Sequence, residues 1–284
     1  MSYHERRRDV LKAIGATGAV ALAGCAGDGG DGSDGGDGGS TGGGGGGPDL
    51  LTVIGYPESG IQLFRDYYAA SDGSEDILMP DGLQDADLPG QVGNEMANVT
   101  GTAPAAGGPN QAAFTQLFED EYGSSPGVFT SQSYDSTAAL ILANVAAGEN
   151  DGTAIRDQLR RIANPDGTEY GPESFLDAVE AAANGENINY QGASSAVNFD
   201  ENGDPASAAY SIWEFAGQGT DSVEVQETQN FEGSNPDGSG PSAEESPGGL
   251  GREVSLGILL PETGDLASVG QEMIDAAEIP VQQV

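Results

Sequence analysis

Residues 50–68 read LLTVIGYPESGIQLFRDYY, and this stretch decides the fold class. Its first five residues are largely apolar and partly β-branched, which suits a strand buried on both faces. The Gly-Tyr-Pro that follows ends the strand, and Ser59 can cap the next helix. Ile61, Phe64 and Tyr68 recur at spacings of three and four, as residues on one face of a helix do. The stretch therefore predicts strand, turn and helix, which is half of a βαβ unit.

A candidate site follows from the turns at which the predicted strands end. In open α/β sheets, ligands bind where strands end and helices begin, because free backbone N–H groups and the helix dipole point there. Tyr56 lies at the end of the first strand, and Asp81 follows a second predicted strand, residues 76–79, in the same way. We expect the two side chains to converge on one groove. The alternative is that Tyr56 packs at the edge of the core and that Asp81 is a turn residue.

The rest of the folded region carries helix and strand patterns. Its periodicity predicts a strand at residues 99–102, helices at residues 111–122, 130–147 and 172–184, and a further helix containing Ile155, Leu159 and Ile162. Residues 196–199 and 208–215 predict two strands joined by an Asn-Gly turn, and residues 221–225 predict a last strand. The fold class is therefore α/β, with an open parallel sheet and helices on both faces.

The Asn-Gly turn is acidic, which raises the question of a calcium site. A calcium-binding loop needs glycine at its sixth position and glutamate at its twelfth. Pro205 and Ser211 stand there instead. We therefore interpret the turn as a hairpin turn and expect no metal site.

Charge dominates the composition. The chain carries 46 Asp and Glu against 9 Lys and Arg, a formal net charge of -37, and Lys12 is its only lysine. Because the acids are scattered, this surface repels nucleic acid and differs from an acidic activation tail. Such a surface is typical of proteins from halophiles, since high salt screens the self-repulsion, and we expect an archaeal source. A partly disordered acidic protein is the alternative interpretation, which we accept for the glycine tracts.

The amino-terminal residues predict export and a lipid anchor. Arg6 and Arg7 precede a short apolar run, which is typical of a twin-arginine signal and too short to span a bilayer. Leu-Ala-Gly-Cys then ends at Cys25, the only cysteine, and is similar to a lipoprotein cleavage box. We therefore expect lipidation at Cys25 and anchoring at the outer face of the cytoplasmic membrane.

Composition divides the chain into five parts. These are a signal with lipobox (1–25), a Gly/Asp-rich tether (26–48), an α/β lobe (49–228), an acidic Gly/Ser/Pro linker (229–252) and a βα fragment (253–284). The tether is expected to be disordered, since glycine costs the most entropy to order and has no side chain to bury. In the last part, residues 253–260 predict a buried strand and residues 266–279 a helix. Nothing nearby in the sequence offers this βα unit a surface to pack against.

Four stretches carry a resemblance to a known family. They read IGYPE (54–58), MPDG (79–82), NFDENGD (198–204) and LLPETGDL (259–266). Together they resemble the branched-chain amino-acid (Leu/Ile/Val-binding) type of ABC-transporter substrate-binding lipoprotein, in a haloarchaeal-like form with the type I periplasmic-binding fold. The resemblance covers about residues 45–230 and 253–284. It implies two α/β lobes that close on a small amphiphile and deliver it to a permease.

The order of these stretches differs from that of the family. LLPETGDL begins the first lobe in the family but ends this chain, and IGYPE belongs to the second lobe but here follows the tether. Most of the first lobe, with the groups that take the ligand's carboxylate, has no matching residues. Two accounts stay open. One is a deletion that fused the signal to a second lobe, followed by the start of another copy, and we favour it. The other is a circular permutant that borrows its missing strands from a partner chain.

The resemblance also implies a ligand site. Tyr56 would line the cleft, and Asp81 would take the ligand's ammonium group through a charge-assisted contact. Asp81 stands where the amino-acid binders usually have glutamate, which changes the reach of the side chain. The further candidates are a residue at a helix start and four from the first-lobe fragment: Tyr134, Thr263, Gly264, Ala267 and Ser268.

We therefore predict a solute-binding protein of an ABC importer for branched-chain amino acids or similar small amphiphiles, and no enzyme. Its partners would be an amino acid or amide, an ABC permease and the membrane that holds its lipid anchor. No cofactor is expected, because the sequence lacks a nucleophile–base pair, a metal-ligand cluster and a phosphate-binding glycine motif. The alternatives are a ligand-sensing receptor module of the same fold and a rearranged, non-functional remnant.

Overall fold

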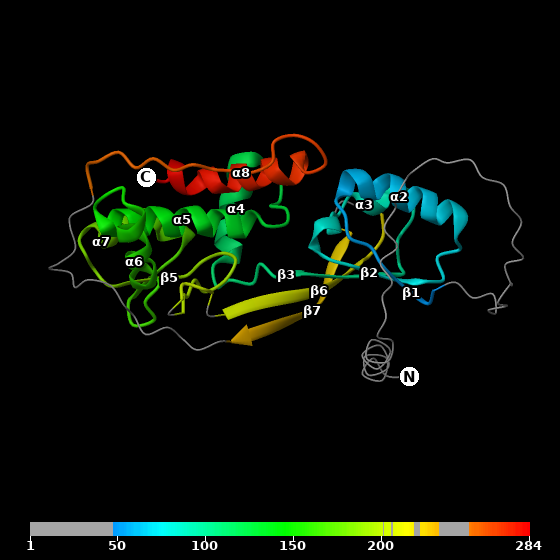
Figure 1. Cartoon of the computed structure of the whole chain (residues 1–284), viewed down its shortest axis with the longest axis horizontal. Coiled ribbons are helices and arrows are strands. Elements are labelled where there is room, and N and C mark those ends of the chain that lie inside the picture. Colours follow the sequence, from blue (N-terminus) through cyan, green and yellow to red (C-terminus); the bar gives the residue numbers. More distant parts are fainter. Residues whose placement is uncertain (1–47, 201, 206, 219–221, 233–249) are drawn as a thin grey trace, which may run out of the picture. The chain divides into compact units, whose positions relative to one another are not determined.

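The computed structural model describes residues 48–200, 202–205, 207–218, 222–232 and 250–284 (Figure 1). The predicted signal, Cys25, residues 26–47 of the tether and residues 233–249 of the linker lie outside the described residues. Among the helices of the described part, none combines the length and apolar character needed to cross a membrane.

The main sheet has five strands in the order β1-β2-β3-β6-β7. Strands β1 (Leu50–Thr52), β2 (Asp76–Met79) and β3 (Val99–Pro104) run parallel to one another. Strands β6 (Ser207–Phe215) and β7 (Val223–Glu232) form an antiparallel pair, and β6 lies antiparallel to β3. The α/β class and the parallel order of the first three strands are confirmed.

Strand β1 lies at the edge of this sheet rather than inside it. Leu50 is 38% exposed and Ile54 is 81% exposed. The prediction that residues 50–54 are buried on both faces is therefore wrong. β1 is also the edge strand of the sheet, since β2 pairs with one side of it and no described strand pairs with the other.

One face of the sheet is packed under helices α2 (Pro57–Ala70) and α3 (Leu88–Val92). Burial alternates along the strands, as the period of two requires. The buried set includes Phe64, Ile77, Met79, Val99 and Trp213. Alternate positions on the other face are exposed or half-buried, so the described helices cover one face of this sheet where the sequence predicted helices on both.

Helix α2 begins earlier than predicted. Pro57 is its first residue and Tyr56 is the N-cap, without a side-chain cap. Ser59, predicted to be the cap, lies inside the first turn, where its Oγ donates to the carbonyl of Tyr56 at 3.2 Å. Proline suits the first helical position because its missing N–H would have no helical partner there.

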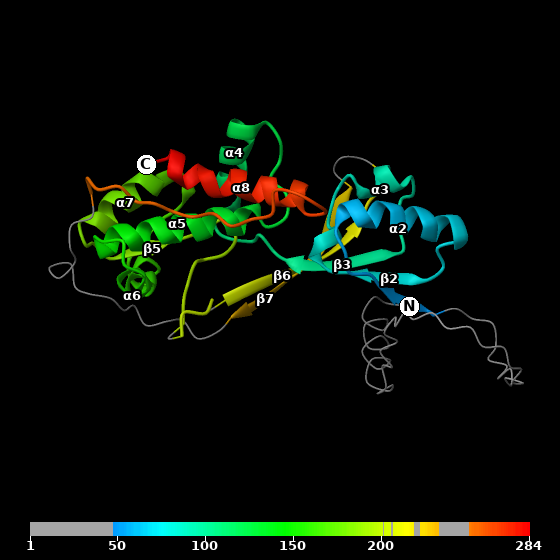
Figure 2. The same ribbon diagram turned by 45° about the horizontal axis from the view of Figure 1, so that its top comes forward.

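A second hydrophobic cluster is helical, and α5 (Thr130–Ala147) lies at its centre (Figure 2). Its other elements are α4 (Gln111–Tyr122), α6 (Gly152–Ile162), α7 (Phe175–Ala183), α8 (Ala267–Gln282) and the short parallel strands β4 (Thr168–Tyr170) and β5 (Ile188–Tyr190), and η2 (Pro172–Ser174) leads into α7. The bounds of α4 and α5 match the prediction. The helix predicted at residues 172–184 forms as η2 followed by α7.

The predicted hairpin between residues 196 and 215 forms only in part. Residues 196–199 make no strand; isolated bridges join Gln191 to Ala196 and Phe199 to Pro205. Strand β6 pairs with β3 and β7 instead. Strand β7 is longer than the strand predicted at residues 221–225 and continues past residue 228, the predicted end of the lobe.

The carboxyl-terminal unit also differs from its prediction. Residues 253–260 are extended but belong to no sheet, and Leu259 is 98% exposed, so the predicted buried strand is wrong. The predicted helix is confirmed as α8, and it is not isolated. The hydroxyl of Tyr122 donates to the carbonyl of Asp275 at 2.9 Å, which ties α8 to α4.

Candidate functional site

Tyr56 and Asp81 follow neighbouring parallel strands, and the structure brings their turns together. The N–H of Val53 donates to the carbonyl of Leu78 at 3.0 Å, so β1 and β2 remain side by side up to these turns. Asp81 opens the short helix η1 (Asp81–Leu83). A Cβ placed on Gly82 would lie 3.1 Å from Cε1 of Tyr56 and 2.6 Å from the carbonyl oxygen of Gly55. The Tyr56 ring therefore lies against Gly82, next to Asp81 in the chain.

The two turns are held to each other by a buried contact. Leu83, at the end of η1, is fully buried. A Cβ on Gly60, in the first turns of α2, would lie 2.5 Å from Cδ2 of Leu83, so helix and turn approach as closely as glycine permits. Above this contact Tyr56 is 39% exposed and Asp81 is partly exposed. An aromatic face and a carboxylate thus reach solvent at the carboxyl edge of the sheet.

The charge around these turns is negative. Glu58, Asp85 and Asp87 lie on the same two connections as Tyr56 and Asp81, and residues 53–59 and 80–88 contain no lysine or arginine. Arg65, further along α2, donates its Nε hydrogen to the carbonyl of Gln91 at 3.0 Å. A cationic group would therefore meet favourable electrostatics at Asp81, where a charge-assisted hydrogen bond is available.

Tyr134 lies in the helical core. Its side chain is 0% exposed, its ring centroid lies 5.2 Å from that of Phe114, and its hydroxyl donates to Oε1 of Gln283 at 2.7 Å. Burial raises the pKa of the Tyr134 phenol well above its usual value. Its contacts in the described part are those of a packing residue.

The four first-lobe candidates lie at the start of α8. Thr263 and Gly264 form an exposed turn, with Gly264 in the left-handed region at φ +80. Ala267 and Ser268 are the first residues of α8. Among the described residues, no hydrogen bond joins any of the four side chains to Tyr56 or Asp81. Tyr56 and Asp81 are the two candidates that the structure brings together, and the ligand roles of all seven stay predictions.

Asp135 is a buried polar residue that the sequence did not single out. Its carboxylate accepts hydrogen bonds from the Tyr190 hydroxyl (3.1 Å), the N–H of Ala193 (2.9 Å) and both the N–H (2.7 Å) and the Oγ of Ser194 (2.5 Å). Burial raises the pKa of Asp135, and these hydrogen bonds oppose that shift. A Cβ on Gly192 would lie 2.3 Å from Asp135 Oδ2. An acidic residue inside an otherwise alanine-rich helical stretch was the available signal.

This carboxylate anchors the connection that leaves β5. Ser194 and Ala193 accept, through their carbonyls, the N–H groups of Gly107 at 3.2 Å and Gly108 at 3.0 Å. Residues 105–110, which follow β3, and residues 191–194, which follow β5, therefore run side by side. Asp135 binds the backbone of residues 193 and 194 in the second of these segments, so its role is to position that backbone.

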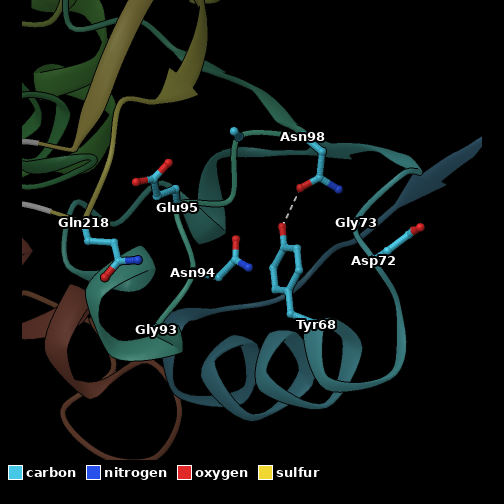
Figure 3. A pocket seen from close by; sticks show the side chains of 9 residues that line it. Tyr68, Asp72, Gly73, Gly93, Asn94, Glu95, Asn98 and Gln218 are labelled. Atoms are coloured by element: carbon cyan, nitrogen blue, oxygen red, sulfur yellow. Dashed lines mark hydrogen bonds between the residues drawn. The ribbon is translucent and has the colours of Figure 1, made fainter.

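A polar depression of about 600 Å³ is lined by Tyr68 and by the turns that lead into β2 and β3 (Figure 3). Its floor is a hydrogen-bonded pair, in which the Tyr68 hydroxyl donates to Oδ1 of Asn98 at 2.6 Å. Asn98 in turn donates from Nδ2 to the carbonyl of Glu75 at 2.7 Å. Because the side-chain amide of Asn98 makes both hydrogen bonds within the fold, we interpret the depression as part of the turns that lead into β2 and β3.

A second groove, of about 760 Å³, is mostly apolar. It lies between α5, α7, α8 and residues 250–258, and Ile141, Val145, Val179, Leu256 and Val281 are among its lining residues. Neither this groove nor the polar depression is lined by Tyr56 or Asp81. Within the described residues, no group of three or more His, Cys, Asp or Glu side chains is placed to hold a metal ion.

No protein-family model and no curated protein matches the chain. A solved structure that does match is a leucine-binding protein, LivK, from Thermotoga maritima, with 22% sequence identity and a TM-score of 0.46. The match covers 64% of this chain and 44% of that protein, so the chain spans less than half of the structure it is similar to.

Proposed function

We propose that this chain is the solute-binding component of an ABC importer for branched-chain amino acids or similar small amphiphiles. The observation that carries the proposal is the packing of the Tyr56 ring on Gly82, directly beside Asp81. It places an aromatic surface and a carboxylate at the carboxyl edge of two parallel strands, where α/β folds bind ligands. The four sequence stretches that resemble the family supply the functional class.

The proposed roles follow from the two side chains. The Asp81 carboxylate accepts hydrogen bonds from the ligand's ammonium group, and the Tyr56 ring covers the ligand's apolar part. Glu58 and Asp85 add to the negative potential that favours an ammonium group and disfavours a carboxylate. The residues that take the carboxylate in the family have no counterpart in this sequence. An amide or amine is therefore as good a ligand as an amino acid.

The location proposed for this protein is the outer face of the cytoplasmic membrane. The twin arginines and Cys25 support export and lipidation, and the glycine-rich residues 26–48 would let the folded part reach a permease. The acidic composition supports a halophilic source. Binding and delivery, rather than catalysis, is the activity that we propose.

Calorimetric titration of the mature chain in molar potassium chloride tests the proposal. The ligands are leucine, isoleucine, valine and their amides, and saturable heat with one of them is the expected result. Asp81→Asn should abolish this heat. Asp120→Asn is the control, because Asp120 is an exposed acid on α4 that accepts a hydrogen bond only from Gln116 among the described residues. Silence with every ligand would favour a non-functional remnant.

A further inference from the structure

The extended segment at residues 253–260, EVSLGILL, behaves as a strand without a sheet. In the described part of the chain, no backbone–backbone hydrogen bond involves residues 254–263. The carbonyl of Glu253 accepts only a long side-chain hydrogen bond from Nδ2 of Asn150, at 3.4 Å. Its backbone donors and acceptors therefore have no backbone partner in the described part of the chain and could pair with another strand.

Burial alternates over the first four residues of this segment. Val254 and Leu256 are half-buried and line the apolar groove beside α5 and α8. Ser255 and Gly257 are exposed, and Ser255 also borders the groove; Ile258 and Leu259 are both exposed, Leu259 by 98%. Part of the segment thus packs on helices, and two adjacent large apolar side chains remain in water.

The segment is held in this extended form by its first residues. Arg252 donates through Nη2 to the carbonyl of Asn144 at 2.6 Å and through Nη1 to Oδ1 of Asn150 at 2.8 Å. At the other end, Pro261 approaches α8 so closely that Gly270 has no room for a Cβ. A strand that is fixed at both ends loses little entropy on pairing, so it is pre-organised for a partner strand.

We infer that residues 254–260 pair with the same segment of a second copy of this chain, in antiparallel order, with Gly257 on the two-fold axis. This register places residue 252 opposite residue 262, so that the positive charge of Arg252, which stays hydrogen-bonded to Asn144 and Asn150, lies near Glu262 of the second copy twice across the interface. It also places Val254 opposite Leu260 and Ser255 opposite Leu259. A parallel, in-register pair would instead set Glu253 against Glu253, and like charges directly opposite one another destabilise a sheet.

A two-fold arrangement fits the rest of the molecule. An isologous pair closes on itself, whereas pairing with the unpaired edge of β1 would be heterologous and would leave a free edge on each copy. The formal charge of -37 makes two copies repel each other, and molar salt screens that repulsion. The dimer is therefore expected in molar salt.

Cysteine crosslinking tests both the partner and the register. The full chain carries Cys25→Ser, so that each introduced cysteine is its only thiol. The single variants are Gly257→Cys, Ser255→Cys and Leu259→Cys, and all three positions are exposed; the Cβ of residue 257 would meet no atom within 4 Å. Light scattering in molar potassium chloride measures the mass before oxidation, and non-reducing electrophoresis measures the crosslinked dimer after it.

The expected result is a dimer by mass in which only Gly257→Cys crosslinks in high yield. On the axis, the two copies of residue 257 lie within the roughly 7 Å that a disulfide can span. Two copies of residue 255, or of residue 259, would lie about 13 Å apart along the strands and stay reduced. Crosslinking of Ser255→Cys or Leu259→Cys without Gly257→Cys would show a shifted antiparallel pair, and crosslinking of all three would show a parallel in-register pair; either result would overturn the inference. A monomer with no crosslink at any position, or a dimer that crosslinks at none of the three, would overturn it as well.

Discussion

The hydroxyl of Tyr134 donates a 2.7 Å hydrogen bond to Oε1 of Gln283, which joins the middle of the helical cluster to the last residues of the chain. Gln283 also donates from Nε2 to the carbonyl of Pro172 at 2.8 Å. One glutamine just beyond α8 thus connects α5 and η2. The carboxyl-terminal unit, which seemed from the sequence to have no surface to pack on, is part of the helical core.

Gln283→Ala should therefore destabilise the protein. The substitution leaves the fully buried Tyr134 hydroxyl without its acceptor, which costs about 1–3 kcal/mol. Chemical denaturation in molar salt, followed by circular dichroism, would show a lower midpoint with an unchanged slope. Gln271→Ala is the matched control, because the Gln271 amide makes its described hydrogen bond on the exposed side of α8, to Asp275. Equal midpoints for the two variants would contradict the role of Gln283.

Asp135 should make stability fall with rising pH. Burial raises its pKa above that of the unfolded chain, so the folded state binds the proton more tightly. The stability from this group is fully present below the unfolded pKa of about 3.9 and is lost as the pH rises through the folded value.

The measurement is the difference in unfolding free energy between the parent and Asp135→Asn as a function of pH. Asparagine does not titrate, and all other carboxylates are shared by the two proteins, so their effects cancel. The parent should lose stability relative to Asp135→Asn as the pH rises above the unfolded pKa of about 3.9. A parent whose relative stability rises as the pH approaches about 3.9 from below, and is flat above it, would mean that the hydrogen bonds from Tyr190 and Ser194 outweigh burial.

The sequence predicted the helical elements well because their own periodicity specifies them. Residues 111–122 carry Phe114 and Phe118 on one face, and both are buried in α4. The elements that failed depend on partners. Residues 253–260 have the alternation of a strand, but alternation does not say whether a neighbouring strand exists. Residues 226–230, QETQN, are too polar to predict the middle of β7, which forms because β6 offers its edge.

The candidate site was also predicted only in part. Tyr56 and Asp81 could be placed together because a right-handed connection between parallel neighbours brings successive strand ends to one edge. Their contact through Gly82 could not be predicted, since it depends on the close approach of two turns. Asp135 was missed because its partners Tyr190 and Ser194 lie far away in the sequence and are brought to it only by the fold.

Gly82→Ala should weaken ligand binding although Gly82 has no group that could hold a ligand. The added Cβ would lie 2.6 Å from the Gly55 carbonyl oxygen and 3.1 Å from the Tyr56 ring, so the two turns must separate. Loss of one charge-assisted contact, worth about 1.5–3 kcal/mol, would weaken binding about tenfold to hundredfold. Calorimetric titration with the ligand that gives saturable heat measures the effect.

Gly152→Ala is the control for that substitution. A Cβ at Gly152 would meet no atom within 4 Å, and this residue opens α6 in the helical cluster. The control should bind like the parent. A Gly82→Ala protein with parent affinity and a parent unfolding midpoint would show that the Tyr56 and Asp81 turns do not act as one site.

Potassium chloride should raise the unfolding temperature of this protein steeply. The formal charge of -37 destabilises the compact state through self-repulsion, and the screening length falls from about 10 Å at 0.1 M salt to about 3 Å at 1 M. Three of the arginines do little to offset it by pairing: Arg65 and Arg252 donate to amide and carbonyl oxygens, and the Arg156–Asp157 pair is exposed. Thermal unfolding in a potassium chloride series, compared with sorbitol of equal osmolality, separates screening from a general solute effect. Because screening is the cause, the chloride series should rise and saturate near molar salt while the sorbitol series stays well below it. Equal rises in both series would assign the effect to solute exclusion instead.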